Sequence, residues 1–302
     1  MRFELRLSRR LLLGGAGLSL WGCAPTTPAS RTPPAPKSST DVQASFAALE
    51  RSVGGRLGVA ALDTARGSRV SYRADERFPM CSTFKLPLVA AVLQRVDAGQ
   101  EQLGRHVTYD QAAVLEYAPT TSQHVGNGLS VEQLCEASLV VSDNTAANLL
   151  LETLGGPPGL TKFFRSIGDV TSRLDRNEPM LNTAVEGDER DTTTPNAMLA
   201  SMNELLLGSV LSTASRERVQ GWLVATKTGS NRLRAGLPPS FRAGDKTGTG
   251  ENGATNDVAI AWPKAQPPLL IAAYSVGSSA STERLSETLA NAARLIVAAT
   301  LG

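Results

Sequence analysis

Strand-like segments in this chain lie only near its two ends, and a long, mostly helical stretch separates them. Short apolar or alternating runs bounded by turn-forming residues predict strands over residues 57–62, 68–72, 245–249, 257–262 and 269–276. Between the two groups, residues 82–223 carry apolar residues mostly at helical spacing. The most economical architecture is therefore one sheet built from both ends of the chain, with helices inserted between its strands.

The expected fold class is α/β: an α+β sandwich domain with an antiparallel sheet flanked by helices, and an inserted all-α domain. Helices predicted over residues 41–53 and 282–300 belong to the sandwich. A length of 302 residues fits about two domains, with a cleft where they meet. The predicted bounds are 41–80 together with 225–302 for the sandwich domain, and 81–224, including the loop 173–191, for the helical domain.

Residues 1–22 have the features of a bacterial export signal. Arg9 and Arg10 precede an apolar run that ends at Trp21, a pattern with twin-arginine character. The run is too short to cross a bilayer as a helix of the mature protein. The segment carries a net charge of +3, so the formal +2 of the whole chain leaves −1 for the rest, and nothing in this balance favours nucleic acid.

Cys23 follows the tripeptide Leu-Trp-Gly, which is similar to a lipoprotein processing site in which the cysteine is lipidated. The alternative is an ordinary signal cleaved slightly downstream. Residues 23–40 hold five prolines among Ala, Ser and Thr, a composition that extends rather than packing into a core. They would serve as a membrane tether or as a spacer. We expect an exported protein, either periplasmic or on the outer side of the cytoplasmic membrane.

The chain has two histidines, His106 and His124, and three cysteines, Cys23, Cys81 and Cys135. These are too few for a His/Cys metal site of familiar spacing, so zinc hydrolases and disulfide scaffolds are disfavoured. We expect neither a metal nor a cofactor.

Several short motifs can be set aside. Residues 248–253 match G-x-G-x-x-G, but a strand rather than a helix follows, which indicates a hairpin connection. No G-x-S-x-G, H-E-x-x-H or P-loop motif occurs. A catalytic serine in this chain would therefore need a base other than histidine.

Ser82 and Lys85 form the S-x-x-K motif of the chain. At a helix start, residues three apart lie on one face, so the lysine amine can reach the serine hydroxyl, which is a poor nucleophile until its proton is removed. A helix-capping serine with a solvated lysine one turn later gives the same pattern. The motif alone therefore decides nothing.

Three further motifs follow in order: Ser142-Asp143-Asn144, then Glu178 with Asn182, then Lys246-Thr247-Gly248. With S-x-x-K they make the set that marks class A β-lactamases, and part of the set is shared with penicillin-binding transpeptidases. The chain resembles a class A β-lactamase over residues 41–302. The resemblance implies a monomeric, exported enzyme that hydrolyses the β-lactam ring of penicillins and cephalosporins through a serine acyl-enzyme, giving antibiotic resistance.

The resemblance also implies a role for each reacting group. Ser82 attacks the lactam carbonyl, and its proton passes to Lys85, or to Glu178 through a water. Lys246 would lower the pKa of Lys85, and Ser142 would pass a proton to the departing nitrogen. Glu178 would then activate the water that releases the product. The backbone N–H groups of Ser82 and Thr249 would hold the oxyanion.

Substrate binding is implied at a second set of residues. Asn144 would bind the side-chain amide of the substrate, and Asn182 would hold the hydrolytic water against the base. The substrate carboxylate would meet the strand residues and one arginine: Lys246, Thr247, Gly248, Thr249 and Arg232. Tyr117 matches the aromatic residue at the cleft entrance, where simple packing is the alternative.

A second K-T-G, residues 227–229, follows a helical segment and has no strand partner directly after it, so Lys246 is the better choice. In the family, this earlier loop delivers an arginine to the cleft. Arg232 matches that arginine, and Arg234 is the competing candidate.

Arg176 and Asp191 lie at the two ends of the loop 173–191, where the family has a salt bridge that clamps the loop. Arg173 and Asp188 are nearby alternatives for such a pair.

The cysteines are expected to be free. Relatives with a disulfide at Cys81 or Cys135 have its partner where this chain has Gly250 or Val89. We therefore predict two buried thiols and no disulfide.

Two other functions remain open from the sequence. The first is a D-Ala-D-Ala peptidase or transpeptidase, which would not need the deacylation base formed by Glu178 with Asn182. A silent cell-wall-binding or sensor lipoprotein would have no need of a hydrolytic base.

Overall fold

The computed structural model describes residues 39–301. The expectations about residues 1–38, which include the export signal, Cys23 and most of the proline-rich segment, lie outside the described residues. No helix within residues 39–301 has the length and apolar character needed to cross a membrane.

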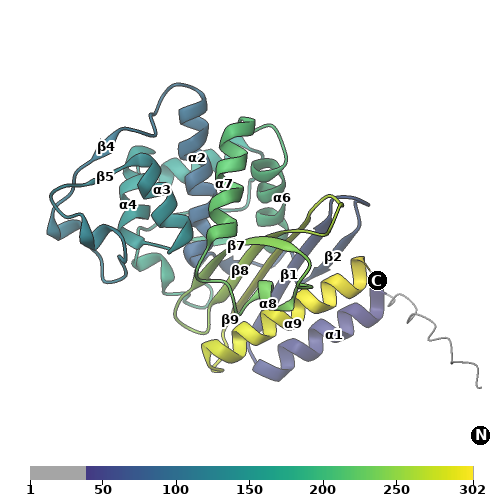
Figure 1. Cartoon of the computed structure of the whole chain (residues 1–302). Helices are drawn as coiled ribbons and strands as arrows, with labels where there is room; N and C mark the ends of the chain where they lie inside the picture. The colour runs from purple at the N-terminus through teal and green to yellow at the C-terminus, as the bar shows by residue number, and fades with distance from the viewer. Residues whose placement is uncertain (1–38, 302) are drawn as a thin grey trace, which may run out of the picture. The chain divides into compact units, whose positions relative to one another are not determined.

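A five-stranded antiparallel sheet joins the two ends of the chain in the order β2-β1-β9-β8-β7 (Figure 1). β1 pairs with β9 along its whole length, so strands about 200 residues apart are neighbours. The predicted sheet is confirmed. The strands are β1 (Arg56–Asp63), β2 (Arg69–Tyr72), β7 (Arg242–Thr249), β8 (Thr255–Trp262) and β9 (Leu269–Val276).

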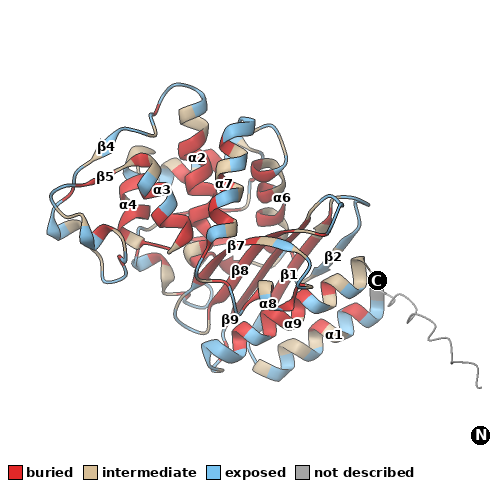
Figure 2. Cartoon of the chain, viewed as in Figure 1, coloured by how far each residue is buried: buried red, intermediate tan, exposed pale blue. Residues whose placement is uncertain are grey.

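Both faces of β1, β8 and β9 are buried, whereas the edge strand β2 is not. Successive side chains of a strand point to opposite sides, so each of the three central strands contributes to two cores. In β9, one face contributes Leu269, Ile271 and Ala273 to a core formed with helices that include α1 and α9. The other face contributes Leu270, Ala272 and Tyr274 to a larger core shared with the helical middle of the chain. Figure 2 shows the central strands as buried between these helices. The helices of the first core are α1 (Ser39–Val53), α8 (Leu233–Gly236) and α9 (Thr282–Thr300).

The middle of the chain is mostly helical, as predicted, and α2 lies at its centre. Residues 85–93 of α2 are all buried, and the helix contacts α3 to α7. Its first residue, Lys85, is therefore held by packing on every side. The helices are α2 (Lys85–Asp97), α3 (Val131–Val140), α4 (Asn144–Thr153), α5 (Pro157–Ser166), α6 (Pro195–Leu206) and α7 (Thr213–Ala225).

Caps fix the gap between α3 and α4. The predicted capping box is present: Ser130 Oγ accepts the Gln133 N–H at 3.2 Å, and Gln133 Oε1 accepts the Ser130 N–H at 2.9 Å. Asp143 caps α4 by accepting the Ala146 N–H at 2.9 Å. The predicted interruption between the two helices therefore falls at residues 141–143.

Four two-residue strands were not predicted, because two residues carry no periodic signal. They pair as β3 (Phe78–Pro79) with β6 (Thr192–Thr193), and β4 (His106–Val107) with β5 (Leu129–Ser130).

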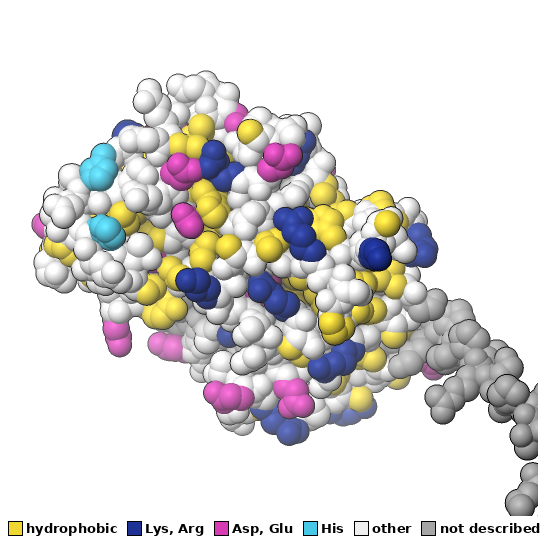
Figure 3. Space-filling view, viewed as in Figure 1, with side chains coloured by type: hydrophobic (Ala, Val, Ile, Leu, Met, Phe, Trp, Pro, Cys, Tyr) yellow, Lys and Arg dark blue, Asp and Glu magenta, His cyan; other side chains and the backbone are white. Residues whose placement is uncertain are grey.

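On the face drawn in Figure 3, basic and acidic side chains are interspersed rather than gathered by sign.

Candidate active site

Ser82 lies in a short 3₁₀ helix, η1 (Cys81–Phe84), that continues directly into α2. The sequence predicts Ser82 at a helix start, and in the structure this 3₁₀ turn forms the start of that helix. The preceding Cys81 has a φ of +45°, a left-handed conformation that is costly for a non-glycine residue. Ser82 Oγ donates a hydrogen bond to Glu178 Oε1 at 3.2 Å. The hydroxyl is therefore directed at a carboxylate that is distant in sequence.

Lys85 is completely buried, and its ammonium group joins three of the four motifs. Nζ donates to the Ser142 carbonyl oxygen at 2.8 Å and to Asn144 Oδ1 at 2.6 Å, and it lies 3.0 Å from Glu178 Oε1. Burial lowers the pKa of Lys85 below its ordinary value, and the Glu178 carboxylate opposes part of this change. All three N–H donors of the ammonium have acceptors.

The S-D-N motif occupies the gap between α3 and α4. Ser142 has a φ of +60°, and its Oγ accepts hydrogen bonds from Lys246 Nζ at 3.0 Å and from Lys85 Nζ at 3.3 Å. Asp143 is buried and also accepts the N–H groups of Thr120 and Thr121, both at 2.9 Å. The aspartate thus ties the loop to the neighbouring segment, while the serine hydroxyl lies between two lysines.

Glu178 and Asn182 face Ser82 from the loop 173–191. Asn182 Nδ2 donates to Glu178 Oε2 at 2.5 Å. The backbone of Glu178 is held by Asn148 on α4, whose side chain donates to the Glu178 carbonyl oxygen and accepts its N–H, each at 3.0 Å. Sequence reasoning missed Asn148. The signal available was its position one turn after Asn144, on the same face of a helix.

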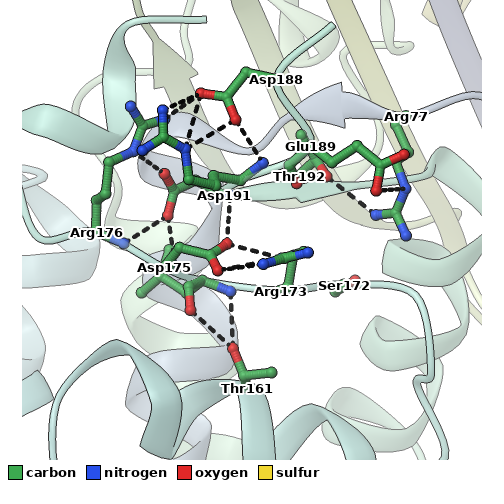
Figure 4. Close-up of polar contacts among 12 residues, drawn as sticks. Arg77, Thr161, Ser172, Arg173, Asp175, Arg176, Asp188, Glu189, Asp191 and Thr192 are labelled. Atoms are coloured by element: carbon green, nitrogen blue, oxygen red, sulfur yellow. Dashed lines mark hydrogen bonds and ion pairs between the residues drawn. The ribbon is translucent and has the colours of Figure 1, made fainter.

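The two ends of the loop 173–191 are joined by the predicted pair. The buried Asp191 accepts from Arg176 Nε at 2.5 Å and from the N–H groups of Asp175 and Arg176 (Figure 4). Of the alternatives, Arg173 pairs with Asp175 instead, at 2.6 Å. Asp188 lies 3.5 Å from Arg176 as an additional partner.

β7 brings the K-T-G motif against the serine. Lys246 is completely buried, and Nζ donates to the Thr247 carbonyl oxygen at 2.8 Å as well as to Ser142. Burial, with Lys85 nearby, holds the pKa of Lys246 well below its ordinary value. A Cβ added at Gly248 would lie 2.7 Å from the Met80 carbonyl oxygen, so glycine is needed for β7 to pack against the turn that carries Ser82.

Arg232 rather than Arg234 reaches the K-T-G strand. Arg232 Nη1 donates to the carbonyl oxygens of Gly248 and Asn256 at 2.8 and 2.7 Å, and Nη2 donates to Thr249 Oγ1 at 2.7 Å. Arg234 pairs instead with Asp245. The second K-T-G begins at the exposed Lys227, two residues after the end of α7, and lies in no strand.

Tyr117 lies beside the S-D-N loop. Its carbonyl oxygen accepts the Asn144 N–H at 3.0 Å, and its side chain is 51% exposed. Tyr117 is therefore not part of the core.

Both cysteines of the described residues, Cys81 and Cys135, are buried and unbridged, as predicted. Burial raises the pKa of each thiol above its ordinary value. Within residues 39–301, no three His, Cys, Asp or Glu side chains are grouped so that they could hold a metal ion.

Comparisons with known proteins agree with this geometry. The family described as "Beta-lactamase enzyme family" matches residues 40–300. The chain is 48% identical over 252 residues to Beta-lactamase AST-1 of Nocardia asteroides, covering 83% of this chain and 81% of the relative. It is also 48% identical over 251 residues to Beta-lactamase L2 of Stenotrophomonas maltophilia, covering 83% of each.

Solved structures give the same answer for the fold. An ancestral class A β-lactamase (GNCA) is 56% identical and superposes with a TM-score of 0.84, covering 85% of this chain and 98% of that one. The four motifs, their assembly around Ser82 and these similarities lead to one conclusion. The chain belongs to the β-lactamase enzyme family and is a class A serine β-lactamase.

Proposed function

We propose that this enzyme opens the β-lactam ring of penicillins and cephalosporins by attack of Ser82, and that Glu178 drives hydrolysis of the acyl-enzyme. The observation that carries the proposal is the contact of Glu178 Oε1 with both Ser82 Oγ, at 3.2 Å, and Lys85 Nζ, at 3.0 Å. A nucleophile, a carboxylate base and a buried cation thus meet at one point.

In acylation, Glu178 is the favoured base in this arrangement. Lys85 Nζ is surrounded by acceptors, namely the Ser142 carbonyl oxygen, Asn144 Oδ1 and Glu178 Oε1. A neutral amine has only two N–H donors, so these contacts favour the ammonium form, which has no lone pair to accept the proton of Ser82. Lys85 would then stabilise negative charge, and the proton would pass to Glu178, through a water when substrate occupies the site.

The oxyanion of the tetrahedral intermediate would be bound by the backbone N–H groups of Ser82 and Thr249. The close approach of β7 to η1 at Gly248 supports this assignment, because it brings together the two segments that carry these peptide groups. Each such donor contributes a factor of about 10² to 10³ to the rate.

Ser142 would pass its hydroxyl proton to the lactam nitrogen as the ring opens. Lys85 would replace that proton on Ser142 Oγ, 3.3 Å away, and would take up from Glu178 the proton that came from Ser82. The Ser142 hydroxyl accepts from Lys246 and Lys85, so its own hydrogen is free to point towards the substrate. The Lys85 ammonium also favours the transient loss of that hydrogen.

Deacylation would use a water held between Glu178 and Asn182. Within residues 39–301, Asn182 Oδ1 is buried and has no hydrogen-bond partner, while Nδ2 of the same side chain is bound to Glu178. Buried polar atoms are normally satisfied, by water where protein offers nothing. A water donating to Asn182 Oδ1 and to Glu178 would satisfy this oxygen.

Substrate recognition would divide between the two sides of the cleft. Asn144 would bind the side-chain amide, with Tyr117 at the entrance. The carboxylate would meet Lys246 and the hydroxyls of Thr247 and Thr249. Arg232 already donates to Gly248, Asn256 and Thr249, so its main effect would be to fix the Thr249 hydroxyl and to add positive potential.

The substrate class is tested by steady-state hydrolysis of benzylpenicillin and a chromogenic cephalosporin by residues 41–302. We expect multiple turnovers of both, and the rate should survive dialysis against EDTA. A single stoichiometric burst without turnover would contradict the proposal, because it would indicate a penicillin-binding target or sensor.

The pair Arg176–Asp191 is proposed to clamp the loop that carries Glu178. Asp191→Asn keeps a side chain that tolerates the φ of +59° but removes the charge that binds Arg176. We expect the free energy of unfolding to fall by about 2 kcal/mol, with a larger loss of kcat than of substrate affinity. Chemical denaturation and steady-state kinetics measure these changes.

Arg190→Ala is the matched control, because Arg190 pairs with Asp188 on the same loop but is exposed. It should leave both stability and kcat unchanged. Equal effects of the two substitutions would show that the buried pair has no special role.

Outside the described residues, we propose export through the signal in residues 1–22, by a twin-arginine route, followed by lipidation of Cys23. Class A β-lactamases are secreted or periplasmic, which supports export. Residues 23–40, of which the last two already belong to α1, would then tether a monomeric enzyme to the outer side of the membrane. Residues 41–80 with 225–302, and residues 81–224, are proposed as its two domains.

A further inference from the structure

The second K-T-G, at residues 227–229, has no part in the assignments above, yet it lies between two halves of the site. On one side, the Lys227 N–H donates to the Val140 carbonyl oxygen at 3.0 Å. Thr226 Oγ1 donates to the Leu139 carbonyl oxygen at the same distance. The segment is therefore bound to the last residues of α3, immediately before Ser142.

On its other side, the same segment is bound to β7. Thr228 Oγ1 lies 2.7 Å from Thr247 Oγ1, a hydrogen bond in which either hydroxyl could be the donor. A Cβ added at Gly229 would lie 1.3 Å from Asp245 Oδ2, so a side chain at this position would displace the Asp245 carboxylate. Residues 226–229 thus connect the S-D-N loop with the K-T-G strand.

We propose that Thr228 is a positioning residue that directs the hydroxyl hydrogen of Thr247 towards the carboxylate of the substrate. Within residues 39–301, the two hydroxyls are hydrogen-bonded only to each other. A hydroxyl has one hydrogen to donate. If Thr228 donates to Thr247, the hydroxyl hydrogen of Thr247 remains available for the substrate. A substrate carboxylate, which can only accept, favours this arrangement, in which Thr228 donates to Thr247 and Thr247 donates to the carboxylate.

This inference rests on the proposed role of Thr247 in binding the substrate carboxylate. The proposed role of Thr228 and a merely structural role of residues 226–229 predict different effects on substrates with and without the carboxylate. Loss of the Thr228 hydroxyl should weaken the enzyme only towards substrates that carry the carboxylate, because a neutral group in that place gains little from a directed O–H donor.

The test compares kcat and KM for benzylpenicillin and for its methyl ester, in which the carboxylate is neutral. For Thr228→Val, which keeps the shape of the side chain, we expect kcat/KM for the acid to fall by a factor of about 2 to 10, because Thr247 loses the neutral hydrogen bond that fixes the direction of its hydroxyl. The value for the ester should change less than about twofold. Thr228→Ser, which restores the hydroxyl, should return the acid to near the wild-type value.

Thr226→Val is the matched control. It removes a hydroxyl two residues away that binds Leu139 and does not touch Thr247. It should lower the melting temperature without changing the ratio of kcat/KM for acid and ester. Thr228→Ala provides a second test if the valine variant does not fold, and the same change in the ratio is expected.

Two results would overturn the proposal. An equal fall for acid and ester in Thr228→Val would make the residue a structural support only, and no fall for either would show that Thr247 needs no partner. If wild type itself does not distinguish acid from ester, the carboxylate role of Thr247 fails and this inference fails with it. If wild type distinguishes them and Thr228→Val distinguishes them equally, only the inference fails.

Discussion

Glu178→Ala is expected to lower kcat for benzylpenicillin by a factor of about 10² to 10⁴ and to leave the antibiotic covalently attached to Ser82. The carboxylate touches Ser82 Oγ and is held by Asn182, and no other described acidic side chain contacts the serine hydroxyl. Without it, the water that cleaves the acyl-enzyme loses its base. Acylation slows less, because Lys85 is freed of the carboxylate that favours its ammonium form and can then accept the proton of Ser82. Stopped-flow absorbance and intact mass, measured on the same mixture, record the stalled turnover and the adduct.

Glu186→Ala is the control for this substitution, because Glu186 is an exposed carboxylate on the same loop. It should turn over at the wild-type rate and show no lasting adduct. A Glu178→Ala enzyme that retained wild-type kcat would contradict the assignment of the base.

Lys85→Ala is expected to act earlier, at formation of the acyl-enzyme. Its ammonium contacts Glu178, Asn144 and Ser142, so its loss removes the cation that stabilises the carboxylate and orders the site. We expect the acylation rate to fall by at least about 10². The free energy of unfolding should fall by about 3 to 5 kcal/mol, because a buried carboxylate is left unpaired. Single-turnover kinetics and chemical denaturation measure the two effects.

The control for the lysine substitution is Lys162→Ala, at an exposed lysine on α5. Neither acylation nor stability should change. If Lys85→Ala acylates at the wild-type rate and only the later step slows, the role given to Lys85 is wrong.

The sheet could be predicted because its signals are local. β9 is an apolar run with the predicted bounds, and α9 begins after the cap Ser281 and continues to Thr300 as predicted. The two-residue strands and the 3₁₀ turn at Ser82 could not be predicted in this way. Their geometry depends on contacts with distant segments, such as β7 packing against η1.

The active site could likewise be predicted only in part. The motifs identify which residues react, since each reacting group needs a particular side-chain chemistry. The resemblance favours Arg232 and leaves Arg234 as a competitor, because both precede the same strand and the path of the backbone decides which guanidinium reaches it. Asn148 and Thr228 carry no reacting group, so their roles emerge only from their contacts with Glu178 and Thr247.

The central claim is that hydrolysis proceeds through a covalent intermediate on Ser82. Its most direct test is rapid acid quenching of the wild-type enzyme with benzylpenicillin within the first turnover, followed by proteolysis and mass mapping of the peptide that contains residues 81–85. We predict an adduct with the full mass of the antibiotic on Ser82 that forms and decays at rates consistent with kcat. Product formation with no adduct at any time, or an adduct on another residue, would contradict the account.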